Sequence, residues 1–172
     1  MNKKMKRLVA MLLCMAMVFA MTACGQNSNG EGTGKTKITL KIGAGHVDTA
    51  TQWTYAVNQY FEPTVAKRVA EETDYEIEWV DAYGGTVAKL GEELEAIESG
   101  LLDIGLVVYV FEPAKLMVHG MTYRMPFQSS DPVAVSESAI ELFDEYPVFK
   151  DTMGKYNMKH LAVMVSDDYN LY

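Results

Sequence analysis

Two short segments in the first half of the chain alternate apolar with polar residues, which predicts β-strands. Apolar side chains occupy every second position of residues 38–42 and 75–79, and Thr, Lys and Glu lie between them. A period of two is typical of a strand with one buried face. Elsewhere the apolar residues recur three and four positions apart, as on one face of a helix. That spacing predicts helices over residues 53–61, 65–70, 90–97 and about 132–149.

Proline and glycine residues punctuate this pattern. Pro63 lies between the helical segments 53–61 and 65–70 and lacks a backbone N–H, so we expect it to kink or restart the helix. Gly84 and Gly85 mark a turn before the next helix, and Gly100 is placed to cap that helix at its C-terminus.

Two further runs are almost continuously apolar. Residues 103–110 and 161–165 contain few polar side chains, as expected of strands that are buried on both faces. Strands and helices therefore alternate along the chain, and no internal repeat is visible. This order predicts an α/β fold, in which a mostly parallel sheet with right-handed crossovers is flanked by helices.

The first 23 residues have the pattern of a secretory signal peptide. Four basic residues within the first seven precede an uncharged apolar run over residues 8–23, which is shorter than a bilayer-spanning helix normally needs. Cys24 follows small residues, as in a bacterial lipobox, where the thiol is acylated and becomes the first residue of the mature protein; Met21 stands in place of the usual leucine. This interpretation predicts lipidation at Cys24. The alternative is an ordinary signal peptide followed by an incidental cysteine.

The region after Cys24 divides into a tether and one domain. Residues 26–37 have no large apolar side chain and are rich in Gly, Asn and Ser, which predicts a flexible tether that spans roughly 20 Å. Residues 38–172 are enough for one domain with its own core. Because Cys14 would leave with the signal peptide, no internal disulfide is expected. The predicted organisation is thus a signal peptide (1–23), a lipidated cysteine with its tether (24–37) and a folded lobe (38–172).

The charge balance argues against some partners. The chain has a net charge of −8, and removal of the four basic residues of the signal peptide would leave −12. The remaining basic residues are scattered and form no stripe, so nucleic acid is not expected as a partner. Membrane contact would come from acyl chains, which contribute about 0.8 kcal/mol for each buried methylene.

Motifs for catalysis, cofactors and metals are missing from the sequence. Gly43-Ala44-Gly45 follows a strand but lacks the third glycine of a dinucleotide loop, and the chain has no phosphate-binding G-x-x-x-x-G-K-[ST] loop. No G-x-S-x-G elbow occurs, and the three histidines have no metal-ligand spacing. We therefore predict a protein that is not an enzyme, with neither a cofactor nor a metal.

Residues 83–127 combine several short motifs in a fixed order. A strand and a glycine turn lead to Leu90-Gly91, a helix ends in Gly-x-x-Asp at Gly100 and Asp103, and a Pro-Phe pair follows at residues 126–127. In this order and spacing the motifs resemble those of the solute receptors of tripartite ATP-independent periplasmic (TRAP) transporters, of the dicarboxylate-receptor type.

The resemblance covers about residues 39–172 and implies a periplasmic-binding-protein-like fold of type II. Receptors of this family have two lobes that close on a ligand, so this chain is expected to hold the first lobe, with the second lobe largely missing. The arginine that clamps the substrate carboxylate in the family would lie beyond Tyr172. Arg124 is not favoured as its substitute, because the family is usually apolar before the Pro-Phe pair.

The resemblance also implies where a ligand would be contacted. The matching positions are His46 after the first strand, Glu92 after the Leu-Gly pair, Tyr109 after the third strand, and Tyr169 and Asn170 near the end. The alternative for each residue is an ordinary surface or core position.

The function implied is that of a lipid-anchored receptor on the extracytoplasmic face of the membrane, in the periplasm or at the cell surface. It would capture a small organic acid, most simply a carboxylate, and deliver it to the membrane subunits of a TRAP permease. Two alternatives stay open at this point: a receptor that serves another permease or a sensor kinase, and a small secreted enzyme.

Overall fold

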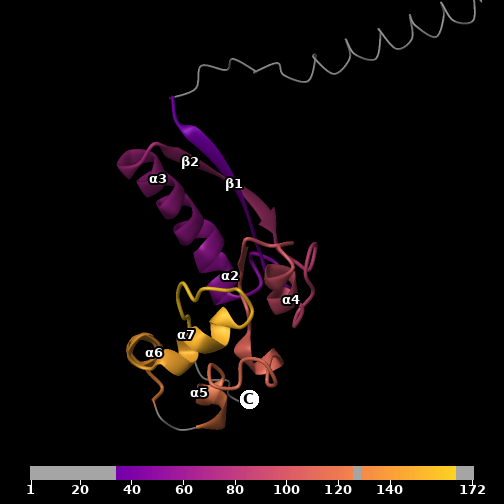
Figure 1. The fold of residues 1–172 in the computed structure, drawn as a ribbon, viewed down its shortest axis with the longest axis vertical. Coiled ribbons are helices and arrows are strands. Elements are labelled where there is room, and N and C mark those ends of the chain that lie inside the picture. The colour runs from indigo at the N-terminus through magenta and orange to yellow at the C-terminus, as the bar shows by residue number, and fades with distance from the viewer. Residues whose placement is uncertain (1–33, 126–128, 166–172) are drawn as a thin grey trace, which may run out of the picture. The chain divides into compact units, whose positions relative to one another are not determined.

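The structure is a computed structural model that describes residues 34–125 and 129–165 (Figure 1). The predicted signal peptide, Cys24 and most of the predicted tether lie outside the described residues, as do Tyr169, Asn170 and the Pro-Phe pair at 126–127. Residues from Lys35 onward form one compact unit.

Three parallel strands form the sheet. β1 spans Thr36–Gly43, β2 spans Tyr75–Ala82 and β3 spans Ile104–Gly105, in the order β2-β1-β3. β1 pairs with β2 along its whole length and with β3 only at residues 42 and 43. The predicted α/β class with a mostly parallel sheet is confirmed.

β1 begins earlier than the alternating pattern predicted. The backbone N–H of Thr36 donates to Asp74 O at 2.8 Å, and the Lys35 ammonium donates to Thr73 O at 2.8 Å. These bonds join the start of β1 to the turn before β2. Thr36 and Lys37 therefore belong to the sheet, and the assignment of these two residues to the tether was wrong.

Three helical segments follow one another without a break: α2 at Gln52–Ala56, the π-helix η2 at Val57–Phe61, and α3 at Glu62–Glu72. Pro63 cannot donate a backbone hydrogen bond, and the wider π turn lies directly before it, with Glu62 N donating to Val57 O. The kink or restart predicted at Pro63 therefore takes the form of a local change from a π-helix to an α-helix.

α4 spans Glu93–Glu98 and is shorter than predicted. Gly91 has a φ of +83°, a left-handed conformation that cannot belong to a right-handed helix, so Leu90 stays in the preceding turn. At the other end Gly100 has a φ of +74° and donates its N–H to Ile97 O at 3.0 Å. The predicted glycine cap of this helix is confirmed.

The third strand is much shorter than the apolar run that predicted it. Only Ile104 and Gly105 pair with β1, and the chain then turns into a 3₁₀ helix, η3, at Tyr109–Phe111. Residues 104–110 are half-buried rather than covered on both faces. β3 is an edge strand of the described sheet. The backbone N–H and C=O groups on its outer side therefore have no neighbouring strand to pair with.

The C-terminal part is helical: α5 spans Met121–Arg124, α6 spans Pro132–Glu145 and α7 spans Pro147–Gly154. Asp131 caps α6 by accepting from Val133 N at 2.9 Å. The single helix predicted over 132–149 was wrong, because Pro147 forces Tyr146 into an extended conformation (φ −102°, ψ 115°) and a new helix starts.

Residues 161–165 form no strand, which corrects the prediction of a buried one. Leu161 is 61% exposed and Met164 is 48% exposed. An apolar run favours the extended conformation, but a strand also needs a neighbour for its N–H and C=O groups. No strand of the described residues pairs with this segment.

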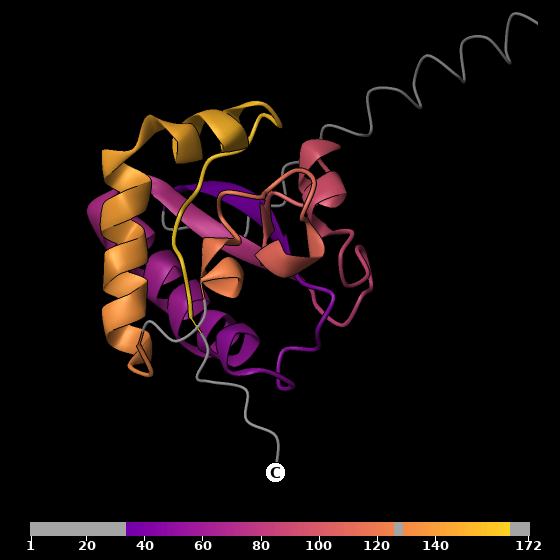
Figure 2. The ribbon, with the colours of Figure 1, turned by 90° about the horizontal axis from the view of Figure 1, so that it is seen from below.

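The carboxyl ends of the strands lie beside the C-terminal half of the chain. α3 packs along β2, α4 packs on β3, and α6 packs on α7 (Figures 1 and 2). One core cluster is built on Ala82, Ala88, Ala96 and Leu102, and the other on Leu94, Leu116 and Met153. Among the helices of the described residues, none has the length and apolar character to cross a membrane.

Candidate functional site

His46 lies directly beyond the end of β1, where parallel sheets commonly place ligand contacts. Its ring meets Trp53 edge-on, with ring centroids 5.6 Å apart, and its carbonyl accepts from Gly84 N at 2.8 Å. Trp53 and Gly84 therefore hold His46 in the loop between β1 and α2. His46 does not line either of the two cavities described below.

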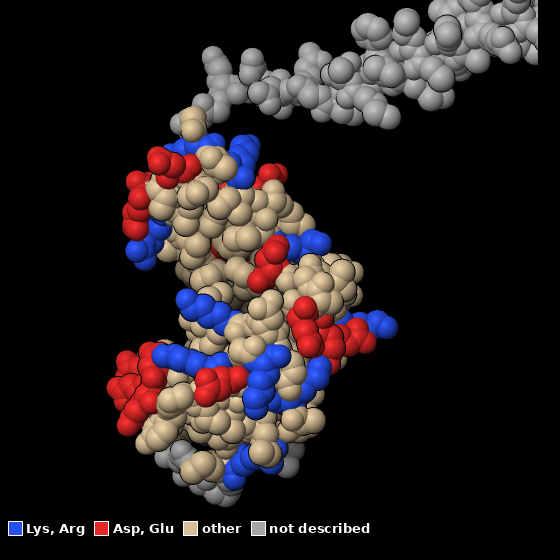
Figure 3. Space-filling view, in the orientation of Figure 1, with Lys and Arg blue, Asp and Glu red and all other residues tan. Residues whose placement is uncertain are grey.

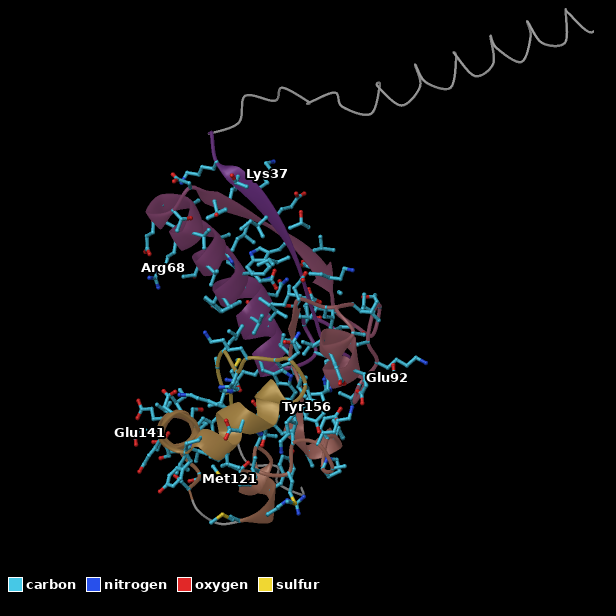
Figure 4. The ribbon with its side chains drawn as sticks, viewed as in Figure 1. Lys37, Arg68, Glu92, Met121, Glu141 and Tyr156 are labelled. Atoms are coloured by element: carbon cyan, nitrogen blue, oxygen red, sulfur yellow. The ribbon has the colours of Figure 1, made fainter. Side chains whose placement is uncertain are left out.

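Glu92 is exposed at the start of α4 and lies on its outer side (Figure 4). Its carboxylate accepts from Lys89 N, in the turn before the helix, at 3.2 Å. The next residue is the buried one: Glu93 is 1% exposed. The Glu93 carboxylate accepts from Gly45 N at 2.9 Å and from Gly91 N at 2.7 Å, so it ties the loop after β1 to α4.

The sequence contained a signal for Glu93 that was missed. Positions 90, 93, 94 and 97 share one face of the predicted helix, and three of them are apolar. An acid in that stripe must be buried with hydrogen-bond donors around it. Its helical phase could therefore have separated Glu93 from the solvated glutamates of the same helix.

Tyr109 borders a cavity of about 280 Å³ at the start of η3. Apolar side chains form most of the lining, with Val110, Pro113, Leu116 and Met117 beside Tyr109. Burial raises the pKa of the Tyr109 hydroxyl, so it stays protonated at neutral pH. It can therefore present a hydrogen-bond donor as well as a ring to the cavity.

Arg124, at the end of α5, brings a positive charge to the same cavity. Within residues 34–125 and 129–165, no acidic side chain forms an ion pair with its guanidinium. Acidic side chains gather elsewhere, for example over α6 (Figure 3). The sequence had pointed away from Arg124, and the fold places it beside the predicted contact Tyr109.

A second cavity of about 360 Å³ lies between the turn before α4 and α4 itself. It is lined by apolar residues such as Val87 and Leu101 and by the carboxylates of Glu92 and Glu95. Lys115 pairs with Glu95 at 2.5 Å. Glu92 therefore faces a different cavity from Tyr109, and the two predicted contacts are not brought together.

A buried acid also lies near the end of β2. Glu62 is 4% exposed and accepts from the Tyr83 hydroxyl at 2.5 Å, and its backbone carbonyl accepts from Trp79 Nε1 at 2.9 Å. Burial is the main cause that raises the pKa of Glu62 to about 7, and neighbouring Asp81 adds to it. Glu62 lines neither cavity, and its hydrogen bonds with Trp79 and Tyr83 join α3 to β2 and to the residue that follows it.

The described residues contain no group of three His, Cys, Asp or Glu side chains that could hold a metal. Tyr169, Asn170 and Cys24 lie outside the described residues, so the structure does not place them. No protein-family model, curated protein or solved structure matches the chain. Any functional conclusion must therefore come from the residues and their geometry.

Proposed function

We propose that the chain is an extracytoplasmic solute-binding receptor that captures a small organic acid and delivers it to a TRAP-type permease. The observation that carries the proposal is the cavity shared by Tyr109 and Arg124. It combines one guanidinium with an apolar and aromatic lining, and its first residue, Tyr109, follows the end of β3 in the chain.

The chemistry of this cavity suits a carboxylate with an apolar body. A guanidinium can donate two parallel hydrogen bonds to one carboxylate, which a lysine cannot do. Leu116 and Pro113 offer surface for carbon atoms, and the Tyr109 hydroxyl can donate to a second oxygen. A volume of about 280 Å³ is small for a ligand cavity, which favours an acid about the size of benzoate.

Replacement of Arg124 by Gln should weaken carboxylate binding about 10- to 100-fold, because a hydrogen bond to a charged group contributes about 1.5–3 kcal/mol. The measurement is isothermal titration calorimetry of the full chain against benzoate, phenylacetate and succinate. Arg68→Gln is the matched control, since Arg68 is an exposed arginine of α3 that pairs with Glu72. Equal affinities of the two variants, or no binding of any acid by the parent chain, would contradict the proposal.

Delivery to a permease and anchoring at the membrane rest on the resemblance and on the lipobox-like segment. Cys24→Ser should release the protein from membranes, because a serine hydroxyl cannot take the place of the thioether that carries the lipid. The measurement is the fraction of protein left in washed membranes after expression in a bacterial host. Retention of Cys24→Ser on the membrane, with Cys14→Ser as the control, would show that the anchor is not a lipid on Cys24.

One observation favours a different class of function. Glu62 has a pKa near 7 beside Asp81 and Tyr83, which are groups that an acid–base catalyst could use. A secreted enzyme would then lose turnover, and not binding, in Glu62→Gln. The receptor proposal stands ahead of this one because Glu62 lines neither of the two cavities.

A further inference from the structure

His119 lies behind the cavity wall in a cluster of aromatic rings. It is 3% exposed, and its ring centroid is 5.3 Å from that of Tyr109, 5.1 Å from Phe143 and 5.3 Å from Phe149. Phe143 in α6 and Phe149 in α7 stack on each other with centroids 4.3 Å apart. His119 thus connects the cavity residue Tyr109 to both C-terminal helices.

Neither ring nitrogen of His119 makes a hydrogen bond of good geometry within the described part of the chain, although the backbone of Phe149 lies close enough to favour the protonated ring. A buried polar group without a partner costs stability, and an apolar side chain of similar shape would avoid that cost. A histidine at this position therefore suggests a role that requires titration. The aromatic faces tolerate the neutral ring, whereas a protonated ring would find only the backbone of Phe149 to favour its charge.

The titratable groups around His119 come from three other segments. His160 lies with its ring centroid 6.4 Å away, Tyr109 contributes a hydroxyl that stays protonated, and Asp144 of α6 influences His160. Burial is the main cause that lowers the pKa of His119 to about 4; repulsion from His160 also lowers it, while a backbone hydrogen bond with Phe149 acts in the opposite direction. Burial also lowers the pKa of His160.

We infer that His119 is a positioning residue, which holds Tyr109 in the cavity wall while its ring is neutral and releases it when the ring is protonated. The role in ligand binding rests on the proposed receptor function. The positioning itself does not, because the packing of His119 on Tyr109 exists without a ligand.

The direction of the pH effect follows from linkage. The folded-state pKa of His119 lies below its ordinary value of 6.5, so the unfolded or locally opened chain binds the proton better. The stability that neutral His119 contributes is complete above pH 6.5 and is lost as the pH falls toward about 4. The cavity wall should therefore loosen on acidification and stay ordered at neutral pH.

The test is a pH titration of the full chain by NMR, with ¹³C labels in the His and Tyr rings. The chain has three histidines, and the variants His46→Gln and His160→Gln assign their signals. We expect the His119 signal to titrate well below pH 6.5 and the Tyr109 signal, assigned with Tyr109→Phe, to change in the same step. Titration of His119 near pH 6.5, or a Tyr109 signal that does not follow it, would overturn the inference.

Two further variants separate positioning from simple packing. His119→Phe keeps an aromatic ring in the cluster and should abolish the acid-dependent change of Tyr109; persistence of that change would contradict the inference. If His119→Phe does not fold, His160→Gln serves instead, and it should raise the titration midpoint of His119 because one repelling charge is gone. An unchanged titration midpoint of His119 in His160→Gln would contradict the inference. Calorimetry with benzoate at pH 7 tests receptor function separately, so failure of one proposal does not hide failure of the other.

Discussion

Glu93→Ala should lower the free energy of unfolding by about 3–5 kcal/mol, one of the two largest effects expected in this chain. The substitution leaves the N–H groups of Gly45 and Gly91 without their acceptor, and each buried unpaired group costs about 1–3 kcal/mol. The carboxylate is buried in contact with both loops, so a small void adds to the loss. The measurement is urea unfolding of the full chain, followed by circular dichroism.

Glu92→Ala is the matched control for Glu93→Ala. Glu92 is the adjacent, exposed glutamate, and its carboxylate accepts from Lys89 N in the turn before α4. Loss of this exposed hydrogen bond should cost no more than about 1 kcal/mol. Similar losses in the two variants would show that Glu93 is not the residue that joins the loop after β1 to α4.

Gly45→Ala should destabilise the protein by about 2–4 kcal/mol, because the loop has no room for a side chain. A Cβ at Gly45 would overlap the backbone N and Cα of Leu90 and would lie 2.8 Å from Glu93 Oε1. The contacted atoms are mostly backbone, so they cannot move aside as a flexible side chain would. Thermal unfolding measures the effect directly.

Gly154→Ala provides the control for this substitution. A Cβ at Gly154, the last residue of α7, would meet nothing within 4 Å. We expect an unchanged or slightly higher stability, since alanine favours a helix over glycine by up to about 1 kcal/mol. An unchanged or higher stability of Gly45→Ala would contradict the close approach of the loop after β1 to Leu90.

The two substitutions should also be coupled, because Gly45 and Glu93 share one hydrogen bond. The combined loss in the double variant should be smaller than the sum of the single losses, since the first change already disrupts that bond. The loop that carries His46 depends on the same contact. Both variants should therefore also alter the environment of Trp53, which packs on His46.

Local patterns predicted the elements that depend on local forces. The alternation at residues 38–42 and 75–79 predicted β1 and β2, and Gly100 predicted the end of α4. Pro147 disfavours a helical conformation at Tyr146, but the spacing of apolar residues continues across it. That spacing therefore predicted one helix where α6 and α7 are separate. The apolar runs at 103–110 and 161–165 predicted strands that the described sheet pairs only briefly or not at all.

The candidate site likewise contains residues that the sequence predicted and residues that it did not. Tyr109 was predicted as a contact, and it lines a cavity, whereas Glu92 lines another and His46 lines neither. Arg124 was not favoured from the sequence, because the resembling family is usually apolar before the Pro-Phe pair, and only the fold shows that it lines the cavity of Tyr109. Glu93 and His119 were not selected, since burial of a polar side chain depends on which segments pack over it.

The sequence by itself determined the α/β class, the parallel order of the first two strands and the end of α4 at Gly100, because propensity, periodicity and turn residues act over a few neighbours. Only the tertiary structure decided that Arg124 joins Tyr109, that Glu93 bridges two loops and that His119 sits unpartnered among aromatic rings. Apart from the bond between Gly91 and Glu93, such contacts join residues at least 10 positions apart, and their energies come from burial and hydrogen-bond geometry in three dimensions.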